Sequence, residues 1–273
     1  MTFAGVSGCG GCVMMTSGNG GLISRIIRGA AVLAGAIAIA GAVPTRVEPS
    51  MYVTRQATVT AALGVTNRDV AASNEKIRMA AASLAHMWQG YFAQVGERFD
   101  VPALARYRGA APSACGIMKQ NNAGYCPSDN TIYFDEVFVA AQAKAAGRQL
   151  GTDGDMAAVG IIAHEMGHAV SIQLGYRSRS TYAMEATADC LAGAFAEQAD
   201  RDGELEPGDI DEAFFGMAAA GDPTPELTGD SRIDRRILRA ASVMGHGTRE
   251  QRTANFRRGL EGGPGACLDE FRS

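Results

Sequence analysis

The chain has 273 residues, which allows one large domain with a sizeable core or two small ones. Apolar residues make up 47% and charged residues 20%, an ordinary balance for a globular protein. The net charge of −4 argues against a nucleic-acid partner, which would require a clustered basic surface.

Residues 1–43 are predicted to form a leader. Arg25 and Arg28 precede an uncharged apolar run over 29–43. This run is shorter than the roughly 20 residues of a membrane span but fits the apolar region of a secretory signal. Two A-x-A patterns, at 38–40 and 40–42, offer cleavage sites, whereas an uncleaved anchor over 22–43 is the alternative. We therefore expect an exported protein, either secreted or associated with the membrane through this segment.

Four cysteines follow the leader, namely Cys115, Cys126, Cys190 and Cys267. In an exported protein they indicate two disulfides, for which three pairings are possible. Cys115 and Cys126 bracket a short Gly/Asn-rich loop, so we expect them to pair and Cys190 to pair with Cys267. In a cytosolic protein the alternative would be four reduced, buried cysteines.

The elements after the leader indicate an α+β domain. Residues 44–66 are rich in Pro and Thr and are typical of a linker, so the domain is expected over 67–273. Its first element is a helix from Asn67 to about Gly96, in which His86 is expected to be a packed or surface residue and not a ligand. A short strand over 101–109 follows.

The strongest strand signal is TIYFDEVF, from Thr131. We expect this strand to lie at the edge of a small sheet, where an extended peptide could add to it, and Asp135 and Glu136 to be solvated. The chain after residue 137 is expected to be mainly helical.

Two of these later helices are expected to carry the functional site. The first would begin with Asp153 or Asp155 as its cap and end before Gly175. The second would begin at Ser180 or Thr181.

The first of these helices contains IIAHEMGHAV. His164 and His168 stand one turn apart on one face, where a single metal ion can bind both imidazoles. Glu165 is displaced by about 100° around the helix, so it flanks the metal as a base and does not ligate it. Two unrelated histidines on a helix would be the structural alternative.

A catalytic zinc site needs a third protein ligand. Glu185, on the second helix, is the predicted third ligand. Asp189, one turn later, is predicted to accept the free ring N–H of His164. Both acids could instead belong to a solvated face, but their neighbours Met184 and Ala188 are apolar.

The order HEMGH then EATAD resembles gluzincin-type metallopeptidases. More closely, residues 67–271 resemble the bacterial putative neutral zinc metallopeptidase family. The matching segments are ACG (114–116), YCPSDNTIYFD (125–135), IIAHEMGHAVSIQLG (161–175), EATADCLAGAFA (185–196), DIDEAFFGMAAAGD (209–222) and HGTREQRTANFRRG (246–259).

The resemblance implies a zincin-like, mainly helical domain with one Zn²⁺ per chain held by His164, His168 and Glu185. Zinc lowers the pKa of a bound water, and Glu165 would act as the general base in peptide hydrolysis. His246 is the candidate donor to the oxyanion, with Tyr176 and Tyr182 as rivals. A histidine that only caps or packs the turn is the alternative for His246.

The sequence therefore predicts a zinc-dependent peptidase acting on a peptide or protein substrate. A non-catalytic zinc-binding or chaperone-like envelope protein is an alternative, although the presence of Glu165 argues against it. A zinc hydrolase of another amide, such as a cell-wall peptide, is a second alternative. The sequence leaves the oligomeric state open.

Overall fold

The computed structural model describes residues 64–176, 180–223 and 225–268. The expected leader, with its membrane segment, and nearly all of the expected linker lie outside these residues. The described part is mostly helical with a small sheet, as expected for an α+β domain. None of its helices is both long enough and apolar enough to cross a membrane.

The first helix of the described residues, α2 (Asn67–Gln94), begins at a capping box in which the Thr66 side chain accepts from the backbone N–H of Asp69 and the Asp69 side chain accepts from that of Thr66. Trp88 and Phe92 are buried on the face that α2 presents to the core. His86 is exposed on the same helix, in keeping with a surface residue.

Two small sheets follow α2. Three strands, β1 (Ala103–Tyr107), β4 (Ala123–Cys126) and β5 (Thr131–Asp135), form a sheet of order β1-β5-β4. β1 runs parallel to β5, and β4 runs antiparallel to it. A second sheet is the hairpin of β2 (Ala111–Ser113) and β3 (Gly116–Met118).

The predicted edge position of the 131–135 strand is wrong. β5 is the central strand of its sheet, and the edge strand on one side is β4. The prediction failed because the segment between Cys115 and Cys126 contributes strands β3 and β4, where only a loop was expected. Both are short strands that contain glycine and carry little strand propensity of their own, so β3 depends on pairing with β2 and β4 on pairing with β5.

Asp135 and Glu136 are buried, so the prediction that they are solvated is also wrong. Asp135 ends β5 and caps α3 (Glu136–Leu150), because its side chain accepts the backbone N–H of Val137. Glu136 is paired with Arg108. The segment over 131–138 therefore consists of strand β5, which ends at Asp135, followed directly by the first residues of α3.

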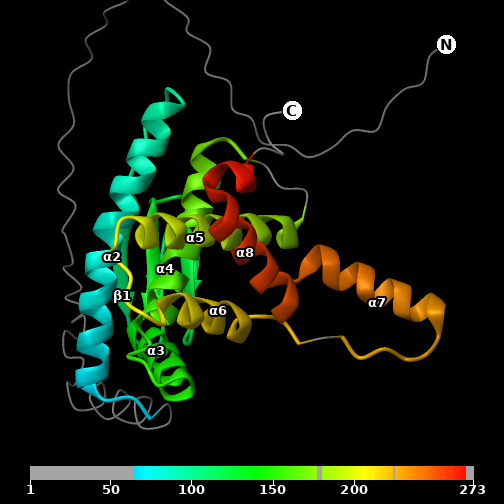
Figure 1. The fold of residues 1–273 in the computed structure, drawn as a ribbon. Coiled ribbons are helices and arrows are strands. Elements are labelled where there is room, and N and C mark those ends of the chain that lie inside the picture. The colour runs from blue at the N-terminus through cyan, green and yellow to red at the C-terminus, as the bar shows by residue number, and fades with distance from the viewer. Residues whose placement is uncertain (1–63, 177–179, 224, 269–273) are drawn as a thin grey trace, which may run out of the picture. The chain divides into compact units, whose positions relative to one another are not determined.

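Helix α4 (Asp155–Gln173) is the central helix and packs against α2, α3, α5 and α6 (Figure 1). Neither Asp153 nor Asp155 caps it, contrary to expectation. Its N-cap is Gly154, and Glu212 supplies the missing acceptor from α6 (Asp209–Ala219). The buried Glu212 carboxylate accepts from the backbone N–H groups of Gly154, at 2.9 Å, and Met156, at 2.8 Å.

Helix α5 (Thr181–Arg201) is capped by Ser180, as expected, and packs along α8 (Arg249–Leu268). Two glycines bring these backbones into contact. A Cβ on Gly193 would lie 1.9 Å from the carbonyl oxygen of Phe256, and a Cβ on Gly259 would lie 1.8 Å from that of Cys190. Only glycine permits this separation of the two helices.

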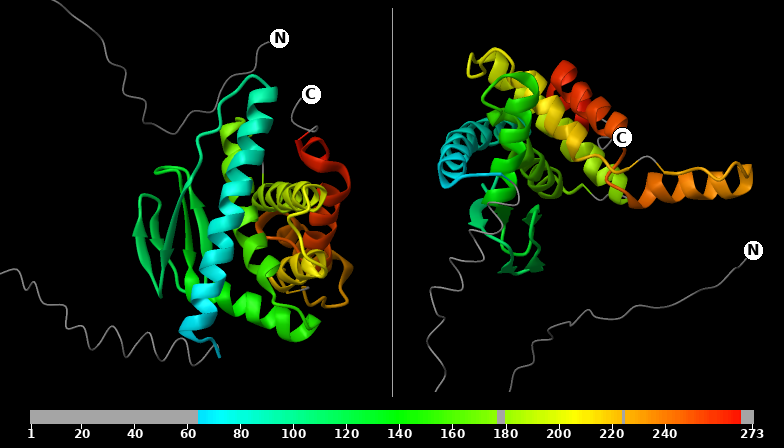
Figure 2. Two further views of the ribbon diagram at one scale, coloured as in Figure 1. Left: turned by 60° about the vertical axis from the view of Figure 1, so that its left-hand side comes forward. Right: turned by 90° about the horizontal axis from the view of Figure 1, so that it is seen from below.

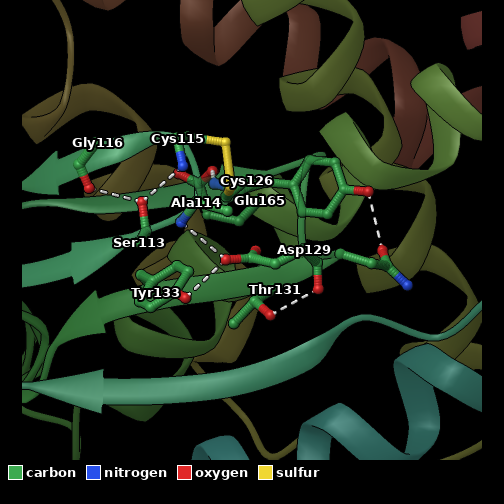
Figure 3. Close-up of a disulfide and its surroundings, with 11 residues drawn as sticks. Ser113, Ala114, Cys115, Gly116, Cys126, Asp129, Thr131, Tyr133 and Glu165 are labelled. Atoms are coloured by element: carbon green, nitrogen blue, oxygen red, sulfur yellow. Dashed lines mark hydrogen bonds between the residues drawn. A yellow bond between two sulfur atoms is a disulfide. The ribbon is translucent and has the colours of Figure 1, made fainter. Parts of the chain in front are cut away.

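Both expected cysteine pairs form disulfides. Cys190–Cys267 joins α5 to the end of α8. Cys115–Cys126 joins the β2–β3 hairpin to the end of β4, and Figure 3 shows it with Glu165 nearby. Because disulfides persist mainly in oxidising compartments, both bridges are typical of a protein outside the cytoplasm.

The remaining helix, α7 (Ser231–Met244), projects from the body of the domain (Figures 1 and 2). Asp230 caps its N-terminus by accepting from the backbone N–H groups of Arg232 and Ile233. Its main contact is with α5.

Replacing Gly259 with alanine tests the α5–α8 contact. The added methyl group would overlap backbone atoms, so the free energy of unfolding should fall by about 3 kcal/mol, at the upper end of the usual cost of overpacking. Urea unfolding of the full, oxidised chain measures it. Gly90→Ala on α2, where no atom lies within 4 Å, is the control and should be neutral or stabilising. Equal stability of the two variants would contradict the contact.

Candidate metal centre

The metal centre begins with the close approach of α4 and α5 at Gly167. A Cβ on Gly167 would lie 2.9 Å from the carbonyl oxygen of Ala188 and 3.0 Å from its Cα. The glycine inside HEMGH therefore lets α4 lie directly against the backbone of α5. This approach brings the histidines of α4 to the acids of α5.

Three side chains converge where the two helices meet. His164 Nε2 lies 3.0 Å from Glu185 Oε2, and His168 Nε2 lies 3.5 Å from Glu185 Oε1. One donor atom from each residue lies within 4.8 Å of the others. His164 and Glu185 are buried, and His168 is partly exposed to solvent. The structure thus brings together all three predicted ligands.

The donor set fits zinc. Tetrahedral Zn²⁺ with bonds of about 2.0–2.1 Å separates its donors by about 3.3 Å. The two observed His–Glu separations, 3.0 Å and 3.5 Å, bracket this value. Two imidazoles and one carboxylate are also a ligand set of catalytic zinc sites, in which the fourth position is left to water or substrate.

Asp189 lies behind this group, in the predicted position. Its Oδ1 is 2.8 Å from His164 Nδ1, so the carboxylate holds that ring nitrogen and leaves Nε2 directed at Glu185. A carboxylate in this position fixes the ring orientation and increases the basicity of a ligating imidazole.

Arg252, on α8, is a member of the site that the sequence did not reveal. Its guanidinium donates to both oxygens of Asp189, from Nη2 at 2.6 Å and from Nε at 3.1 Å. Nη1 donates to the carbonyl oxygen of Ala220 at 3.1 Å. Both Arg252 and Asp189 are buried, so the two charges compensate each other away from water.

The carboxylates make the site attractive to a cation. Burial acts to lower the pKa of His164, but hydrogen bonds with Asp189 and Glu185 outweigh it and raise that pKa to about 10. Burial acts to raise the pKa of Glu185, but hydrogen bonds with His164 and His168 hold it well below its usual range. Glu185 is therefore ionised at neutral pH and available as a ligand.

Glu165 stands beside the three donors but is held by a different element. Its Oε2 accepts the backbone N–H of Tyr125 at 2.8 Å. Tyr125 belongs to the edge strand β4, whose end is joined to the β2–β3 hairpin by the Cys115–Cys126 bridge (Figure 3). The position of Glu165 is therefore set by strand β4 as well as by α4.

A cleft of about 580 Å³ opens over the metal centre. Its lining includes Asn122 and residues 123–125 of β4, together with the three donor residues and Glu165. The other lining residues come mainly from α3, α4, α5 and α6: Phe138, Gln142, Ile161, Ile172, Met184, Gly216, Met217, Ala219 and Ala220. Most of these side chains are apolar.

His246 also lines the cleft, and it is exposed. Its Nδ1 lies 3.5 Å from Asp222 Oδ1, and Asp222 Oδ2 accepts the backbone N–H groups of His246 and Gly247. Asp222 therefore fixes this turn and faces the His246 ring. Asp222 was not recognised as part of the site from the sequence.

Tyr176 and Tyr182 are not among the described residues that line this cleft. Tyr176 follows α4 and borders a separate depression with Tyr91 and Leu268. The ring of Tyr182 lies against the backbone of Gly247. His246 is thus the better placed of the three candidate oxyanion donors.

The chain matches the family model described as Putative neutral zinc metallopeptidase over residues 2–271, and it belongs to that family. It is 32% identical to Uncharacterized protein YpfJ of Escherichia coli strain K12 over 222 residues, which cover 75% of this chain and 73% of that protein. It is 28% identical to Uncharacterized protein Rv2575 of Mycobacterium tuberculosis strain ATCC 25618 / H37Rv over 191 residues, 62% of each chain. No solved structure matches the chain. Family membership supports a zinc peptidase.

Replacing Arg252 with methionine tests the buried pair with Asp189. Removing one partner leaves an uncompensated buried carboxylate, so the free energy of unfolding should fall by about 3–5 kcal/mol. Chemical unfolding at neutral pH measures the change. Arg98→Met removes a surface arginine that is 88% exposed and should cost at most about 1 kcal/mol. Similar stability of the two variants would show that Arg252 does not compensate Asp189.

Proposed function

We propose that this protein is an exported zinc peptidase in which Glu165 is the general base. The contact between Glu165 and the backbone of β4 carries the proposal. It places a carboxylate beside the three-donor group and at the wall where a peptide would lie.

His164, His168 and Glu185 would hold one Zn²⁺ per chain, with Asp189 and Arg252 keeping His164 oriented. When bound, zinc acts as a Lewis acid toward a carbonyl oxygen and lowers the pKa of water from 15.7 to about 7. The buried carboxylate pair around His164 supports this assignment, because Asp189 holds Nδ1 and so keeps Nε2 on the side of Glu185, where a metal ion would replace the proton of that nitrogen.

Glu165 moves the proton in this mechanism. Its Oε2 is engaged by Tyr125, so we assign Oε1 to the proton transfer. The carboxylate takes a proton from the attacking water and then delivers it to the nitrogen of the leaving amine. The Tyr125 contact keeps Glu165 in place through both transfers.

The substrate is proposed to lie along β4. The Tyr125 N–H points to Glu165 and not to β5, so Tyr125 and Ile132 form a non-hydrogen-bonded pair of the antiparallel ladder. By the same alternation, the carbonyl groups of Ala123 and Tyr125 face away from β5. An extended peptide can donate its backbone N–H groups to them, as in β-strand addition.

His246 is proposed to donate a hydrogen bond to the developing oxyanion. The contact of its Nδ1 with Asp222 leaves Nε2 for the substrate, and its exposure allows the ring to move toward a bound peptide. A zinc hydrolase of another amide would use the same residues, so the choice of substrate decides between the two activities.

Replacing Glu165 and Glu185 with glutamine separates catalysis from metal binding. Glu165→Gln keeps the shape of the side chain but removes the proton acceptor. It should retain about one zinc per chain and lose peptide hydrolysis by roughly 10²–10⁴-fold. Glu185→Gln should lose zinc affinity together with activity. Metal analysis and cleavage of a peptide library, with and without a chelator, measure both effects.

Hydrolysis by Glu165→Gln at the parent rate would contradict the mechanism. A parent protein that holds zinc but cleaves no member of a broad library would favour the non-catalytic zinc-binding alternative. Cleavage of cell-wall peptides alone would point to the other amide hydrolase. Unchanged zinc content in Glu185→Gln would remove Glu185 from the ligand set.

A further inference from the structure

Helix α7 carries large apolar side chains that the rest of the described chain leaves exposed. Ile233 is 47% exposed and Leu238 is 48% exposed, and Leu227, in the preceding segment, is 55% exposed. Large apolar side chains grouped on one exposed element indicate an interaction surface. This surface is separate from the cleft, because none of these three residues lines it.

The residues of α7 are sorted into two faces. Ile233, Ile237, Ala240 and Ala241 recur at spacings of three and four, which places them on one side of the helix. Leu238 lies about 140° around the helix from Ile233, outside this face. The second face consists of Arg232, Arg235, Arg236 and Arg239, at the same spacings. At about 100° per residue the two faces are centred about 130° apart, so the basic face begins next to the apolar one.

The charge of α7 is opposite to that of the whole chain. The helix contains four arginines and one aspartate, whereas the chain has a net charge of −4. Its single acid, Asp234, is used locally, because its side chain accepts from Thr228 and Gly229 in the turn before the helix. A partner of α7 must therefore offer apolar contact and negative charge together.

We propose that α7 binds the surface of an anionic lipid bilayer, with its apolar face inserted between the headgroups. A membrane offers both features along the full length of a straight helix. A basic face beside a compact apolar face is the composition of helices that lie in the membrane interface. Arginine stems can pass over apolar atoms while their guanidinium groups reach the lipid phosphates.

This attachment would hold the domain at a membrane surface whether the predicted leader is cleaved or remains as an anchor. It also places the helix that precedes the His246 turn, and so one side of the cleft, close to the bilayer. Membrane binding by α7 does not depend on the peptidase activity and can be tested in the absence of turnover.

A tryptophan in place of Ile233 reports on α7 alone in the full chain. The native tryptophan, Trp88, is fully buried and gives a constant background. Adding vesicles of phosphatidylglycerol and phosphatidylcholine should shift the emission of Ile233→Trp to shorter wavelength. Vesicles of phosphatidylcholine alone should not. Met79→Trp on α2, at a position that is 48% exposed, is the matched control and should not respond.

Removing positive charge tests the lipid contact itself. In the Ile233→Trp chain, replacing both Arg235 and Arg236 with glutamine should weaken the affinity for the anionic vesicles by about 25-fold, a factor of about five for each arginine. An equal shift with both vesicle types, or no shift with either, would overturn the proposal. A shift that grows with protein concentration without vesicles would identify a second copy of the chain as the partner and would also overturn it.

Discussion

The contact between α4 and α5 at Gly167 is the constraint on which the site depends. A single glycine allows the backbone of α5 to approach where any side chain would meet Ala188. His164 and His168 stand on either side of this contact in sequence, and Glu185 and Asp189 lie on the facing helix. The separation between imidazole and carboxylate, and hence the size of ion that fits, follows from the spacing of the two helices. A wider spacing would leave the same residue types unable to share a metal.

Electrostatic contacts connect this helix contact to α8, because acidic and basic side chains alternate from the metal centre outward. Glu185 faces His164, His164 faces Asp189, and Asp189 faces Arg252. Each buried charge has a partner of opposite sign or a polar contact, which buried charges require if the fold is to be stable.

Arg252 reaches Asp189 because α8 lies against α5 at Gly193 and Gly259, and the Cys190–Cys267 bridge fastens the same pair of helices. The geometry of the metal centre therefore depends on how α8 packs against α5.

Local patterns in the sequence were sufficient to predict the two helices of the site and the residues that meet between them. The HEMGH spacing defines one face of α4, and EATAD repeats a one-turn spacing on α5, so the convergence of His164, His168 and Glu185 could be anticipated. The disulfide pairing followed from the short segment between Cys115 and Cys126 and from elimination.

Contacts between distant segments could not be predicted in this way. The position of β5 in the middle of its sheet depends on pairing with β4, a strand of weak propensity, as well as with the predicted strand β1. The capping of α4 by Glu212 joins positions 58 residues apart, and the Arg252–Asp189 pair joins positions 63 residues apart. A buried arginine looks like any other arginine in a sequence, because only the tertiary fold determines its burial. Asp135 and Glu136 illustrate the same limit, since their charge predicted solvent exposure whereas the fold uses them as a cap and an ion-pair partner.

The central claim is that two imidazoles and one carboxylate hold a zinc ion between α4 and α5. X-ray absorption at the zinc edge of the purified protein tests it directly, because the spectrum reports the atoms bound to the metal. The predicted result is a first shell of nitrogen and oxygen at about 2.0–2.2 Å, with the outer-shell scattering of two histidine rings. Sulfur scattering at about 2.3 Å, or a shell without histidine, would contradict the account.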